Sequence, residues 1–134
     1  MERLYARVMG PYMSTVAFDD DVRHLLQDMW HLKDWLKNDP GTSKMCDYEG
    51  EVARSTSLRI LADLANGSKH LARNHNRVHA DVVSTNITVH VGQNRPADID
   101  YVVELGSGER LSIQDVIRSA HDDWVSILKG VGLL

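Results

Sequence analysis

Hydrophobic and polar positions alternate with helical spacing through the first half of the chain. The clearest apolar stripe recurs every three or four residues between positions 19 and 38, and it consists of Val22, Leu25, Leu26, Met29, Leu32 and Leu36. Three aspartates at 19–21 precede the stripe, where carboxylates suit the unpaired N–H groups of a helix start, and Asn38-Asp39-Pro40-Gly41 follows it. The pattern predicts a helix over residues 19–38. The aliphatic part of Lys33 and the rings of Trp30 and Trp35 are expected to widen its buried face.

Two weaker patterns predict further helices. Residues 2–14 have helical spacing, but Gly10-Pro11 interrupts them, so we expect a short helix, a kink and a second piece. Residues 49–66 carry a second buried face, and Asn66-Gly67 is typical of a left-handed helix terminus.

Beyond Gly67 the spacing changes from helical to alternating. β-branched residues predict strands over 80–92 and 98–105, joined by a hairpin loop, and a Gly-Ser-Gly turn predicts a third strand over 109–111. The run Ser112-Ile113-Gln114-Asp115 has capping-box spacing and opens a helix over 113–129. We therefore predict an α+β fold in a single domain, 1–134. It is a helical bundle of two long helices plus a C-terminal helix, with a small antiparallel β-meander inserted before the last helix.

Composition narrows the class of protein. The chain has 134 residues, of which 43% are hydrophobic and 25% charged, as in a soluble globular domain. A net charge of −4 disfavours broad, salt-driven binding to nucleic acid. A single cysteine, Cys46, excludes an intrachain disulfide and fits a reducing compartment, and no apolar run approaches the ~18 residues that span a bilayer. We expect a cytoplasmic protein without membrane contact.

Polar side chains follow one face of each predicted long helix. On the first helix they are Gln27, His31, Asp34 and Asn38. On the next they are Arg59, Asp63, Asn66 and His70, at spacings of four, three and four. Helices joined by a loop of about ten residues are typically antiparallel neighbours, so we expect the two polar faces to meet.

These faces suggest a ligand-binding pocket with seven candidate residues: His31, Asp34, Arg59, Asp63, Asn66, Lys69 and His70. In this interpretation Arg59 orients Asp63 as an ion pair, and Lys69 with the backbone near Gly67 contacts a small anion. Asp34 would hold the tautomer of a histidine. The alternative is two solvated faces, in which Asp63 and its neighbours only brace a turn.

The seven histidines predict no metal site. Three of them, His70, His75 and His79, cluster within ten residues, but their spacing matches no zinc motif. The chain also lacks a GxSxG elbow, a GxGxxG loop and a P-loop. We therefore expect no cofactor.

Two stretches resemble a known set of sequences. His31-Leu32-Lys33-Asp34-Trp35-Leu36 and the run from Asp63 to His70, with the terminal segment 124–128, resemble small uncharacterised bacterial and phage proteins. This resemblance implies a role in phage–host conflict and brings no settled activity.

More distantly, the bundle resembles the HEPN superfamily, whose enzymatic members cleave RNA without metal. Their signature is an Arg, a polar residue, several further residues and a His, and Arg73-Asn74 followed by His79 matches it. The resemblance implies that Arg73 stabilises phosphate charge and that His79 moves protons.

Three functions remain open. The first, which we favour, is a non-catalytic protein that binds a small anionic ligand or a protein partner. The second is a HEPN-like metal-independent endoribonuclease with Arg73 and His79 as its catalytic pair. The third is a structural or assembly subunit, because edge strands and bundle faces often mediate homo-oligomers. We expect a homo-oligomer in the first case also.

Overall fold

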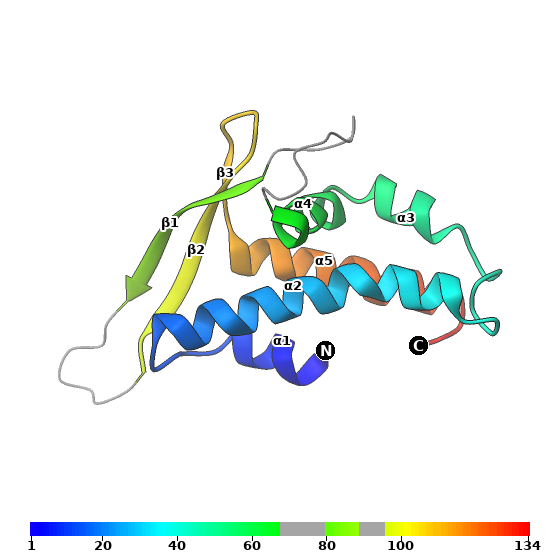
Figure 1. The fold of residues 1–134 in the computed structure, drawn as a ribbon, viewed down its shortest axis with the longest axis horizontal. Helices are drawn as coiled ribbons and strands as arrows, with labels where there is room; N and C mark the ends of the chain where they lie inside the picture. Colours follow the sequence, from blue (N-terminus) through cyan, green and yellow to red (C-terminus); the bar gives the residue numbers. More distant parts are fainter. Residues whose placement is uncertain (68–79, 89–95) are drawn as a thin grey trace.

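The computed structural model describes residues 1–67, 80–88 and 96–134. In this part of the chain the elements follow in the order α1 (Glu2–Val8), α2 (Thr15–Asn38), α3 (Tyr48–Arg54), α4 (Thr56–Asn66), β1 (Asp81–Thr88), β2 (Asp98–Glu104), β3 (Arg110–Ser112) and α5 (Ile113–Gly130) (Figure 1). Helices combined with a small antiparallel sheet, and a helix after the strands, confirm the predicted α+β class.

The long helix α2 begins four residues before its predicted start. Ser14 has an extended backbone, and its side chain accepts a hydrogen bond from the N–H of Ala17 at 3.1 Å, so Ser14 is the N-cap. The aspartates at 19–21 therefore lie inside the helix. Asp21 accepts hydrogen bonds from Arg7 of α1 and from the hydroxyl of Tyr12, and these bonds tie the N-terminal segment to α2.

The predicted second helical piece before residue 14 is absent, because the backbone there pairs with another segment. Tyr12 forms an antiparallel bridge with Ala97, with N–H to O distances of 2.8 and 3.1 Å. Gly10 and Pro11 separate α1 from this bridge.

The helix predicted over 49–66 is in fact two helices. Ser55 ends α3 and caps α4, since its hydroxyl oxygen accepts the N–H of Leu58 at 3.0 Å. The same hydroxyl donates to Asp123 of α5 at 2.5 Å, which fixes the break. Gly67 ends α4 with a φ of +60°, as the predicted terminus requires, but its ψ of −169° lies outside the left-handed helical region.

The sheet has the strand order β1-β2-β3, and both neighbouring pairs are antiparallel. The register of β1 against β2 runs from Asp81 opposite Glu104 to Thr88 opposite Asp98, with a bulge between Val82 and Ser84. The predicted turn before β3 contains Gly108 at a φ of +91°. The last four residues of the predicted first strand, 89–92, lie outside the described residues.

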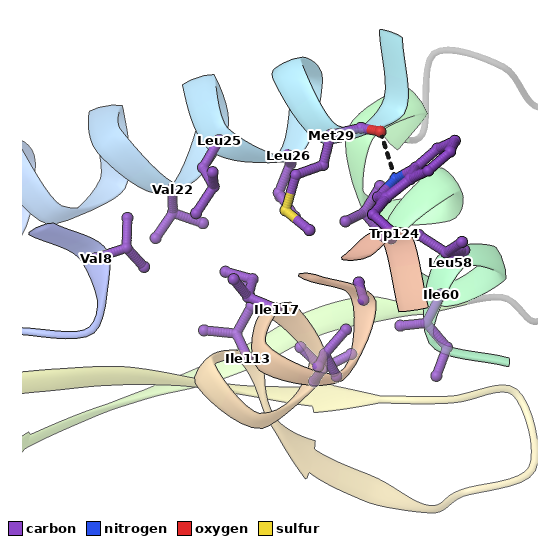
Figure 2. Packing of buried hydrophobic residues seen from close by; sticks show 14 of the residues in the cluster. Val8, Val22, Leu25, Leu26, Met29, Leu58, Ile60, Ile113, Ile117 and Trp124 are labelled. Atoms are coloured by element: carbon purple, nitrogen blue, oxygen red, sulfur yellow. Dashed lines mark hydrogen bonds between the residues drawn. The ribbon is translucent and has the colours of Figure 1, made fainter. Parts of the chain in front are cut away.

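Buried side chains of α2 and α5 meet in the core (Figure 2). The predicted stripe of α2 is confirmed, with Leu32 partly buried and the rest buried, and Trp124 of α5 donates its indole N–H to the carbonyl of Met29 at 2.9 Å. The side chain of Lys33 is also buried, with its Nζ 3.8 Å from the ring centroid of Trp30. Trp35, however, is 60% exposed, so its predicted place in the core is wrong. At about 100° per residue around the helix axis, Trp35 lies roughly 140° from Val22, the first residue of the buried stripe.

Of the described helices, none is both long and apolar enough to cross a membrane.

Candidate functional site

The two predicted polar faces meet at one point within the described residues. Gln27 of α2 donates a hydrogen bond from Nε2 to the carbonyl of Ala65 in α4 at 2.6 Å. His31 and Asp34, farther along α2, are exposed. The candidates Lys69, His70, Arg73 and His79 lie outside the described residues.

On α4 the predicted residues differ in their surroundings. Asp63 is buried, with 9% of its surface exposed, and it accepts the N–H of Ala80 at 3.3 Å. Arg59 and Asn66 are half-buried. The expected Arg59–Asp63 pair is not among the ion pairs of the described residues, and Arg59 Nε is buried there without a hydrogen-bond partner.

Asp63 lines a cavity of about 180 Å³ between α2, α4 and the sheet. Its polar lining residues are Asp19, Arg23, Asp63, Asp81 and Tyr101. Gly67 and Ala80 also line the cavity, so the chain on both sides of segment 68–79 borders it. The volume is below the roughly 300 Å³ at which drug-sized pockets begin, so only a small chemical group fits.

A hydrogen-bonded chain on the cavity wall joins the sheet to α2. The Tyr101 hydroxyl donates to Asp19 Oδ1 at 2.7 Å, and Arg23 Nε donates to Asp19 Oδ2 at 2.6 Å. Burial acts to raise the pKa of Asp19, but the hydrogen bonds from Arg23 and Tyr101 outweigh it and leave that pKa lowered. Burial, followed by the bond to Asp19, raises the pKa of Tyr101 and keeps its hydroxyl a donor.

The charge of this wall bears on the ligand. Arg23 is the one cationic side chain among the described residues that line the cavity, and it is already paired with Asp19. Within the described residues, the cavity therefore offers no unoccupied cation to the small anion that the sequence predicts.

The second unusual feature is strand β1. All eight of its residues are exposed, including Val82 at 45%, Val83 at 46% and Ile87 at 50%. Among the described strands β1 forms one edge of the sheet, and Figure 1 shows it on the outer side of β2. The edge therefore presents backbone hydrogen-bonding groups together with apolar side chains.

The usual protections of an edge strand are largely missing from β1. From residue 82 to residue 88 the sequence contains no charged residue and no proline, both of which normally discourage pairing at a free edge. The two such devices in the strand, the charge of Asp81 and the bulge at Val83, both lie at the strand start.

The apolar face of β1 continues the core face of β2. Ile87 pairs with Ile99, which is 2% exposed, and Thr85 pairs with Tyr101, which packs edge-on against Phe18 of α2. The helices thus cover β2 and leave most of its neighbour β1 exposed.

Sequence reasoning missed both features for physical reasons. Asp19 was interpreted as part of a helix start, and its partner Tyr101 is 82 residues away, so no local pattern connects them. For β1 a signal did exist, namely an uncharged run of Val, Ser, Thr, Asn and Ile at positions 82–88.

Other reactive groups in the described residues have structural surroundings. Cys46 is half-buried, and burial, reinforced by Glu51 and Asp47, raises the pKa of its thiol, so it is a poor nucleophile. His121 stacks on Tyr5 at 4.1 Å and contacts Glu2 at 2.9 Å. Within residues 1–67, 80–88 and 96–134, no three His, Cys, Asp or Glu side chains are grouped to hold a metal ion.

No protein-family model, curated protein or solved structure matches this chain.

Proposed function

We propose that this chain is a non-catalytic binding protein that takes an extended protein segment onto the free edge of β1. The observation that carries the proposal is the exposure of all eight residues of an edge strand without a charge between 82 and 88. The proposal selects a protein partner over the small anion, because the one cationic side chain among the described cavity residues, Arg23, is already paired with Asp19.

Strand addition uses groups that β1 already presents. Alternate residues of an edge strand direct their N–H and C=O groups away from the sheet, so eight residues offer about four such pairs to an incoming strand. The main-chain hydrogen bonds supply affinity, and the exposed side chains of Val83 and Ile87 supply specificity.

A binding role also fits the state of the polar groups. The described Tyr and Asp groups near the cavity hold one another through hydrogen bonds, which leaves them occupied in structure. The HEPN-like alternative depends on Arg73 and His79, which lie outside the described residues, and no feature of the described residues favours it.

The test uses a synthetic alternating peptide, Thr-Val-Thr-Val-Thr-Val-Thr, titrated into isotope-labelled protein and followed by NMR. We expect saturable shifts of backbone amides within residues 81–88. The same peptide N-methylated at alternate residues lacks the required donors and should leave those amides unshifted.

Two variants make the result specific. Ile87→Lys should weaken peptide binding at least about tenfold, since it places a charge on the apolar edge. Met45→Lys introduces the same group at a residue with 46% exposure in the α2–α3 loop and should bind like the wild type. Shifts scattered over the surface, or none in β1 of a chain that is monomeric under the same conditions, would disprove strand addition.

A further inference from the structure

The side chains of β1 are arranged symmetrically about Thr85. Thr85 and Ile87 pair with Tyr101 and Ile99 of β2 and share the sheet face that packs against the helices. Val83 is the residue at the bulge and has no partner in β2; alternation counted back from Thr85 places it on the same face as Thr85, which is also the face of Val82, the partner of Val103. Ser84 and Asn86 occupy the opposite face. Reading outward from Thr85, each direction meets one polar residue and then one β-branched apolar residue.

We infer that the partner of β1 is a second copy of this chain, paired antiparallel about a two-fold axis through Thr85. This inference rests on the proposed function. In this register Val83 of each copy lies opposite Ile87 of the other, and Ser84 lies opposite Asn86. Apolar residues meet apolar residues on one face, and polar residues meet polar residues on the other. Cross-strand pairs of these kinds stabilise antiparallel sheets.

Charge selects the antiparallel arrangement. Asp81 opens the strand, and a parallel, in-register pairing would place the two Asp81 carboxylates side by side. In the antiparallel register the Asp81 residues lie eight positions apart along the strands, which is about 27 Å at ~3.4 Å per residue. This separation exceeds the Debye length of about 8 Å at physiological ionic strength, so their repulsion is screened.

The absence of charge from residues 82–88 also favours β1 as the place where two acidic chains pair. Each copy carries a net charge of −4, so the copies repel one another over most approaches. Residues 82–88 carry no charge, so contact along them brings no like-charged side chains of this segment together.

Pairing about a two-fold axis closes the assembly. It joins two three-stranded sheets into one continuous sheet whose remaining edges are the β3 strands. Each β3 is only three residues long and carries the charged Arg110, and short or charged edges resist further pairing. The geometry therefore predicts a dimer and not a filament.

The first experiment maps the register by disulfide cross-linking. Cys46 is replaced by Ser, and single cysteines are introduced at 83, 84, 85, 86 or 87, all of which are exposed. Opposed antiparallel residues have Cβ atoms about 4.5–5.5 Å apart, close to the range a disulfide needs. Under mild oxidation we expect Thr85→Cys to cross-link with itself, and Ser84→Cys to cross-link with Asn86→Cys only when the two are mixed. Cross-links centred on another residue, or none above the level of a cysteine at position 45, would overturn the register.

The second experiment measures mass by sedimentation velocity across a concentration series. The wild type should be dimeric, and a Val83→Lys/Ile87→Lys variant should dimerise about a hundredfold more weakly because like charges then face one another. Mixing it with Val83→Glu/Ile87→Glu should restore a heterodimer, whereas Met45→Lys should dimerise like the wild type. Circular dichroism checks that each variant is folded.

The outcomes separate this inference from the proposed function. A wild-type chain that stays monomeric at millimolar concentration, yet binds the alternating peptide on β1, would refute self-pairing and keep strand addition. A monomer that also fails to bind the peptide would refute both.

Discussion

Replacing Trp124 with Phe should destabilise the protein by about 3 kcal/mol. Trp124 is 1% exposed, and its ring fills the space between α5 and α2 in Figure 2. Its indole N–H donates to the carbonyl of Met29 at 2.9 Å. Phenylalanine keeps an aromatic ring there but lacks the donor and the second ring.

Three contributions give the magnitude. The lost hydrogen bond is worth about 1 kcal/mol net, and the Met29 carbonyl keeps its place in the helix, so no buried acceptor is left without a partner. Removing about 40 Å² of buried apolar surface costs ~1 kcal/mol at about 25 cal/mol per Å². A residual void of about 40 Å³ costs ~1 kcal/mol more.

Urea unfolding followed by far-UV circular dichroism measures this loss. Trp35→Phe is the matched control, since the same chemical change at a residue 60% exposed should cost under about 0.5 kcal/mol. A loss below about 1 kcal/mol for Trp124→Phe, or equal losses for the two variants, would show that the α2–α5 contact contributes far less than its burial implies.

Three further predictions concern charge, capping and backbone conformation. The hydrogen bond from Arg7, acting against burial, lowers the pKa of Asp21. The ionised carboxylate therefore stabilises the fold fully above the unfolded pKa of about 4, and this contribution is lost as pH falls through the lower folded pKa. Asp21→Asn should therefore lessen the loss of stability between about pH 5 and pH 2, measured by circular dichroism. Ser55→Ala should cost about 1–2 kcal/mol in urea unfolding by removing the cap of α4, and Ser55→Thr should recover most of it. Gly108→Ala should lower thermal stability by about 1 kcal/mol because φ is +91°, whereas Gly130→Ala, at the helical end of α5 with open space around it, should raise stability slightly.

Local periodicity predicted the elements well where one helix or strand determines its own pattern. The buried stripe of α2 and the cap of α5 at Ser112 follow from spacing and capping chemistry within a few residues. The start of α2 was missed because three consecutive aspartates outweighed the single cap at Ser14. The break at Ser55 depends on Asp123 of α5, so tertiary structure decides it.

The candidate site was less accessible to sequence. Helical spacing placed Asp63 and Asn66 on one face, but it could not show that Asp63 would be buried against the backbone of Ala80. It made His31 a candidate site residue and left out Gln27, although of these two it is Gln27 that donates a hydrogen bond to α4. Which element a polar helix face packs against depends on tertiary structure, and the periodicity of a sequence does not contain this information.

The exposure of β1 makes the local stability of this strand depend on whether a partner strand is bound. The helices bury Ile99 and Val103 of β2, which are 2% and 0% exposed, while β1 is held mainly through its ladder to β2. A strand with one paired edge and little buried surface opens more readily than the strand it pairs with. A second strand on the other edge would protect it, and mass action then makes its stability depend on protein concentration. Hydrogen exchange of β1 amides should slow as wild-type concentration rises, whereas exchange in β2 should change less. A β1 exchange rate independent of concentration would mean that nothing pairs with this edge in solution.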